Sequence, residues 1–160
     1  MANPYLFVSA LLLLAVPHLC SVLRFWASAP HALRCLYIAG PCTSVWNHGS
    51  NSRAALWADR SAMALGCLID CRFILFVLPR CTADGVTISA LLAAAVALYS
   101  LAKMLASDPL HVLSHACVSA AHFAMLAAWP HAAASGSSST PPPFAACLEF
   151  CRAAAVFGGN

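Results

Sequence analysis

The chain has 160 residues, of which 62% are hydrophobic and 8% are charged. Soluble domains carry about 25% charged residues, so this composition excludes an ordinary soluble globule. The mean hydropathy is +0.81 and the formal net charge is +3. The eight Lys and Arg residues form no basic cluster, which argues against nucleic acid as a partner. At about 20 apolar residues per crossing, the length allows five or six membrane helices.

Apolar runs between turn residues predict an all-α fold, a polytopic transmembrane bundle of five to six helices that forms one integral membrane domain over residues 1–160. The predicted helices cover residues 5–26, 31–46, 53–78, 86–105 and 109–129, with a shorter one over 143–157. Ser, Gly and Pro residues predict a flexible loop over 132–143. We interpret the first helix as a retained anchor; the alternative is a cleaved secretory signal, since Ala27, Ser28 and Ala29 imitate a cleavage site.

A few polar residues interrupt these apolar helices. An ionisable group at membrane depth costs about 2.5 to 3.5 kcal/mol, so it needs a partner or a function. Ser44 and His48 are four residues apart at the end of the second helix, which puts both on one face. The turn residues 49–52 reverse the chain and bring Asp59 back opposite His48. His111 and His115 repeat the four-residue spacing at the start of the fifth helix.

The up-and-down order of the helices places these five residues on one side of the membrane. Three imidazoles, two of them at positions i and i+4, form the ligand set of a catalytic zinc ion that keeps its fourth position for water. The residues therefore predict a Zn²⁺ site of His48, His111 and His115 that activates water for hydrolysis. Asp59 is expected to accept the proton of that water, and Ser44 to donate to the oxyanion or to orient Asp59.

Other polar residues lie within the predicted helices. His122 shares a helix face with His115 and is either a donor in the second layer around the zinc site or a histidine satisfied within the bundle. Asp70 needs a partner on another helix, because Arg72 is only two residues away and cannot face it. Three histidines near prolines or helix ends are interpreted as interfacial: His18, His31 and His131.

A known family shows a similar pattern of polar residues. The matching segments are Ser44-x-x-x-His48, Asp59-x-x-x-Met63 and His111-x-x-x-His115. They resemble the motifs of the alkaline ceramidases and of the wider CREST superfamily of membrane hydrolases and receptors, over about half the chain. The resemblance implies a shortened member of that superfamily in which the three histidines hold zinc, Asp59 and Ser44 complete the site, and an amide bond of a membrane lipid is hydrolysed.

We therefore expect a multi-pass zinc hydrolase of the endomembranes, ER or Golgi, that cleaves a ceramide-like amide or an ester of a membrane lipid. Two other classes stay open. One is a non-catalytic small membrane subunit or a degenerate relative with a structural metal site, and the other is a protein that binds b-type haem through two histidines. A homodimer or a larger membrane complex is a further possibility, because five helices alone do not fully enclose a lipid tail.

Overall fold

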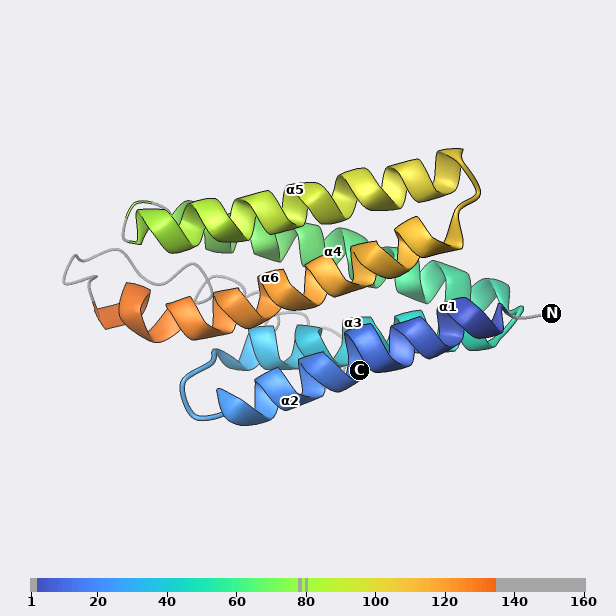
Figure 1. Ribbon diagram of the computed structural model, residues 1–160. Helices are drawn as coiled ribbons and strands as arrows, with labels where there is room; N and C mark the ends of the chain where they lie inside the picture. The colour runs from blue at the N-terminus through green and yellow to red at the C-terminus, as the bar shows by residue number, and fades with distance from the viewer. Residues whose placement is uncertain (1–2, 78, 80, 135–160) are drawn as a thin grey trace, which may run out of the picture.

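Five antiparallel helical rods make up the computed structural model, which describes residues 3–134 except 78 and 80 (Figure 1). The first rod is continuous through α1 (Pro4–Ser9), the π-helical turn η1 (Ala10–Ala15) and α2 (Val16–Arg24). The others are α3 (His31–Gly49), α4 (Arg53–Val77), α5 (Thr82–Met104) and α6 (Asp108–Ala134). No strand occurs among the described residues, so the predicted all-α fold is confirmed.

The first helix begins with a side-chain cap. The side chain of Asn3 accepts hydrogen bonds from the backbone N–H groups of Tyr5 and Leu6 and so begins α1. The predicted loop at 132–143 is wrong in its first residues, because α6 continues to Ala134 with Pro130 inside it. The rest of that loop and the predicted helix over 143–157 lie outside the described residues.

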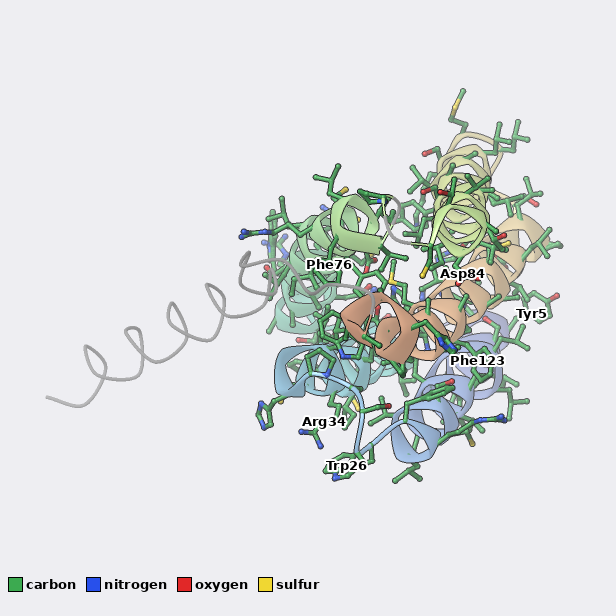
Figure 2. All side chains as sticks on the ribbon, turned by 90° about the vertical axis from the view of Figure 1, so that its left-hand side faces the viewer. Tyr5, Trp26, Arg34, Phe76, Asp84 and Phe123 are labelled. Carbon is green, nitrogen blue, oxygen red and sulfur yellow. The ribbon has the colours of Figure 1, made fainter. Side chains whose placement is uncertain are left out.

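The central helix of the bundle is α6. Seen along the bundle axis, the other helices surround it (Figure 2), and it packs against α1, η1, α2, α4 and α5. The largest buried apolar side chains lie in the half of the bundle that holds the α2–α3 and α4–α5 connections: Val22, Leu33, Tyr37, Phe73, Val77, Ile88, Met125 and Leu126. The other half, at the end with Asn3, the α3–α4 turn and the start of α6, holds most of the polar side chains discussed below.

Three of the five rods are long and apolar enough to cross a membrane: residues 4–24, α5 and α6. Large apolar side chains cover the outside of the bundle, and four aromatic residues near helix ends are about half exposed or more: Tyr5, Trp26, Trp46 and Trp57. Trp and Tyr are enriched at membrane–water interfaces. Beside Trp26, the guanidinium of Arg34 lies 4.5 Å from the indole ring (Figure 2). This surface is the kind that a membrane protein presents to lipid and to the interface.

The remaining two helices, α3 and α4, are less apolar than the other three. At 1.5 Å per residue they span about 28 and 37 Å, which is enough for a hydrocarbon core of about 30 Å. Their lower hydropathy has a local cause, because α3 carries Ser44, Asn47 and His48 whereas α4 carries Asp59 and Asp70. Three of these side chains are buried inside the bundle: Ser44, Asp59 and Asp70.

Candidate metal centre

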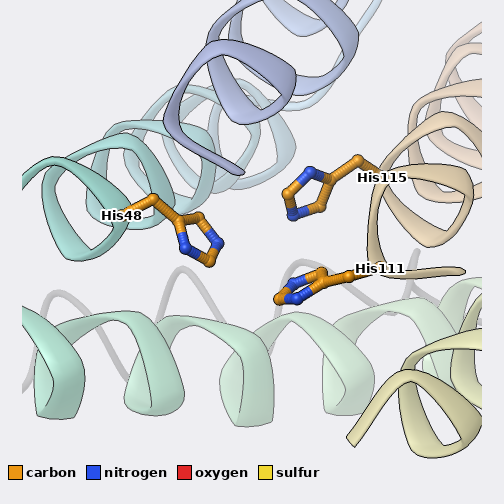
Figure 3. A group of neighbouring side chains, drawn as sticks. All are labelled: His48, His111 and His115. Atoms are coloured by element: carbon orange, nitrogen blue, oxygen red, sulfur yellow. The ribbon is translucent and has the colours of Figure 1, made fainter. Parts of the chain in front are cut away.

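Three histidines from two helices converge at one end of the bundle. His48 comes from the last turn of α3, and His111 and His115 come from the N-terminal part of α6. Their ring centroids are 4.9 to 5.6 Å apart, and one nitrogen of each ring lies within 4.8 Å of the others. Figure 3 shows the three rings turned toward one shared space. We call these residues the histidine triad.

Contacts among the N-terminal segment, α3 and α6 bring the triad together. The Asn3 side chain donates to the Asp108 carboxylate at 2.9 Å and so fastens the start of α1 to the start of α6. Next to His48, a Cβ atom on Gly49 would lie 3.0 Å from the Phe7 ring, so the glycine permits close approach of α1 to α3. His111 and His115 are buried, whereas His48 is half-buried.

The tautomer of His115 follows from its neighbour Ser9. The Ser9 hydroxyl donates its one hydrogen to the Leu6 carbonyl at 2.9 Å, and its oxygen lies 3.2 Å from His115 Nδ1. The oxygen must therefore accept a hydrogen from Nδ1, which leaves Nε2 with a free lone pair. Metal-binding histidines commonly have this arrangement, with one nitrogen on the metal and the other held by a hydrogen bond.

The Asp59 carboxylate lies at the same end of the bundle and is 7% exposed. Its Oδ2 accepts a hydrogen bond of 2.7 Å from the side-chain amide of Asn47, the residue directly before His48. Asp59, Ser44, His111 and His115 all line one cavity of about 320 Å³ between the helices. This volume lies in the range of about 300 to 1,000 Å³ that is typical of small-molecule sites.

Several neighbours of the triad carry no signal in the sequence. Ser9, Asn47 and Tyr99 contact it or its aspartate through the tertiary fold, with the Tyr99 ring 5.2 Å from that of His111. For Ser9 alone the sequence gives a partial signal, because it is the only serine in the apolar run between Tyr5 and Pro17. A hydroxyl there needs a polar partner, but the sequence does not say which.

His122 belongs to a different group of side chains. Both of its ring nitrogens are engaged away from the triad, Nε2 with Asp70 Oδ2 at 3.0 Å and Nδ1 with His18 Nε2 at 2.6 Å. Asp70 thus finds the partner on another helix that its position requires. The interpretation of His18 as interfacial is wrong: it is 3% exposed, because the rod that carries it packs along α6. His31 and His131 are exposed.

The donor set of the triad fits a metal ion. Zinc at about 2.05 Å from each nitrogen, in tetrahedral geometry, needs nitrogens about 3.3 Å apart. The ligand atoms of the triad lie within 4.8 Å of one another, so shifts of about 1 Å or less per side chain would close the site. The triad could hold a metal ion, and the three nitrogens do not specify which metal.

The chain has no match among protein-family models, curated proteins or solved structures.

Proposed function

We propose that this protein is a multi-pass membrane hydrolase that holds Zn²⁺ on His48, His111 and His115 and cleaves an amide or ester bond of a membrane lipid. The observation that carries the proposal is the convergence of three imidazoles, two of which line one cavity between apolar helices together with Asp59 and Ser44. Three histidines and an open position are typical of catalytic zinc. The resemblance to the alkaline ceramidases favours an amide of the ceramide type and an endomembrane location.

The chain's own residues would share the remaining chemistry. A bound zinc ion would supply Lewis acidity, which lets water lose a proton and act as a nucleophile at neutral pH. Asp59 takes a proton from the attacking water and returns it to the leaving amine or alcohol, so the proton balance closes within one turnover. Asn47 holds one carboxylate oxygen and leaves the other for this transfer. Ser44, one turn before His48, donates to the oxygen on which negative charge develops.

Metal content tests the ligand set directly. His48→Ala and His115→Ala should each lose bound zinc, measured by elemental analysis of the purified protein, because two imidazoles hold the ion far less tightly than three. His131→Ala is the matched control, since His131 lies exposed at the far end of α6. Wild-type zinc stoichiometry in the His48 or His115 variant would overturn the assignment, and a Soret band in the wild-type spectrum would indicate haem instead.

Asp59→Asn separates an enzyme from a protein with a structural metal. The variant should keep its zinc, because the carboxylate is not assigned as a ligand. Hydrolysis of a fluorogenic lipid amide should fall by about 10²- to 10⁴-fold, the usual contribution of a general base. Full zinc together with the absence of hydrolysis in wild type, across amide and ester lipids, would favour the non-catalytic alternative.

A further inference from the structure

A second group of polar side chains lies deeper in the same cavity. His18 of α2, Tyr37 of α3, Asp70 of α4 and His122 of α6 all line it, and each comes from a different helix. Their exposed fractions are 3, 1, 5 and 12%. The Tyr37 and His122 rings stack, with their centroids 4.1 Å apart. Hydrogen bonds join His18 to His122 and His122 to Asp70. We call these four residues the deep cluster.

The hydrogen bonds fix the total charge of the deep cluster. The Leu14 carbonyl can only accept, so His18 Nδ1, 2.7 Å away, carries a hydrogen. The contact between His18 and His122 needs one hydrogen, and the contact between His122 and Asp70 needs another. Three protons on two imidazoles and one carboxylate give a net charge of zero, however they are distributed. An ionic ligand group would break this balance in a buried site and is therefore disfavoured.

One carboxylate oxygen in the deep cluster is left without a close donor among the described residues. Asp70 Oδ2 is bonded to His122, but Oδ1 has only the Tyr37 hydroxyl at 3.4 Å. That distance exceeds the usual O–H···O range of about 2.5 to 3.0 Å. The same hydroxyl lies closer to the Met125 sulfur, at 2.9 Å. Because both nitrogens of each imidazole are engaged, the cluster has a spare acceptor but no spare N–H donor.

Open space connects the deep cluster with the triad. His122 is seven residues beyond His115, which is about 10 Å along α6. Between the two groups the wall contains Gly40, one turn after Tyr37, and Gly66, one turn before Asp70. A Cβ atom built on either glycine meets nothing within 4 Å. These glycines therefore leave room inside the cavity and do not serve close packing of helices.

We propose that the deep cluster is a second binding site, which takes the hydroxyl group of an aliphatic chain lying in the cavity, with Asp70 Oδ1 as the acceptor. The apolar middle of the cavity, with Leu92 and Val96 in its wall, suits the hydrocarbon, and the neutral cluster with its spare acceptor suits an uncharged donor. Binding at this site involves none of the triad nitrogens, so it is independent of the proposed zinc chemistry.

The test uses metal-free full-length protein in detergent micelles, with 1-octanol as the probe and nonane as its apolar counterpart. The chain has only four aspartates, so labelling with ¹³C at the aspartate carboxyl gives four signals, assigned with Asp59→Asn and Asp70→Asn. Octanol should shift the Asp70 signal and leave that of Asp59 unchanged, and nonane should not reproduce the shift. A response at Asp59 alone, an equal response to nonane, or no response would overturn the proposal, leaving the deep cluster as a purely structural link between helices.

A pair of variants checks access to the site without touching a polar group. Gly66→Leu fills the middle of the cavity and should abolish the response of Asp70 to octanol. Ala64→Leu is its control, because Ala64 is exposed on the outside of α4, and it should behave like wild type. An unchanged response in Gly66→Leu would contradict entry through the cavity.

Discussion

A single hydroxyl on the first rod decides which nitrogen of His115 is available at the triad. The Ser9 oxygen accepts from Nδ1 because its own hydrogen is used on the Leu6 carbonyl. Without this bond the ring could rotate or take the other tautomer, and the position of Nε2 would no longer be fixed. Ser9 is thus a positioning residue for the proposed zinc ligand, although it lies more than a hundred residues earlier in the chain.

Ser9→Ala should weaken zinc binding by about 10- to 100-fold, the usual cost of losing a hydrogen bond behind a metal-binding histidine. Competition with a chromophoric zinc chelator measures this affinity independently of turnover. Ser21→Ala is the control, because Ser21 is also buried on the first rod but donates to the carbonyl of Pro17 within it. Equal affinities for the two variants would contradict the role of Ser9.

At the scale of elements, the π-turn η1 and Pro17 change the hydrogen-bonding of the first rod. Pro17 has no backbone N–H, so the carbonyl of Leu13 lacks the donor that a regular α-helix would give it. The Ser119 hydroxyl of α6 donates to that carbonyl. The His18 ring, placed on the next turn, bonds to the Leu14 carbonyl and reaches His122. The irregular turn therefore ties the first rod to the central helix.

Ser119→Ala should lower the free energy of unfolding by about 1 to 3 kcal/mol, because it removes the hydrogen bond that the Leu13 carbonyl accepts in place of the one from residue 17. Thermal unfolding followed by circular dichroism in detergent measures the change. Ser100→Ala serves as the control, since that hydroxyl is exposed and bonds within its own helix, so its replacement should cost less than about 0.5 kcal/mol. A cost for Ser119→Ala as small as that of the control would show that the Leu13 carbonyl finds another donor.

In the whole molecule, the five rods alternate in direction, so the connections between them lie at the two ends of the bundle (Figure 1). The α3–α4 and α5–α6 connections lie at the end that holds the triad, and the α2–α3 and α4–α5 connections lie at the other. If all five rods cross the bilayer, each end faces one aqueous compartment. The triad then lies near one membrane surface, and the deep cluster lies toward the middle of the bilayer.

Labelling with a membrane-impermeant thiol reagent tests this arrangement in sealed membranes, in a background with the native cysteines replaced by alanine. Ser52→Cys and Ser107→Cys should be labelled from the same side, and Ser28→Cys from the opposite side only. Labelling of Ser52→Cys and Ser107→Cys from different sides would mean that α4 and α5 do not both cross. Once detergent opens the membranes, all three cysteines should be labelled, which shows that each thiol is reactive.

Patterns along the chain were enough to predict the five helices and the residues of the triad. Apolar runs of membrane length leave the backbone little alternative to helix, and the turn residues between them set the order of directions. That order, with the four-residue spacing of His111 and His115, was enough to predict that both meet His48. These features are local or follow from alternation along the chain, so no packing detail was needed to find them.

The partners of the buried polar side chains depend on how the helices pack in the folded bundle. Which face of a helix touches which neighbour depends on packing angles and on the irregular turn η1, and neither follows from apolar periodicity. For this reason the bonds of Ser9 to His115, of Asn47 to Asp59 and of His18 to His122 appear only in the folded bundle. The space beside Gly40 and Gly66 has the same origin, because a glycine in a sequence does not show whether a helix or a cavity lies opposite.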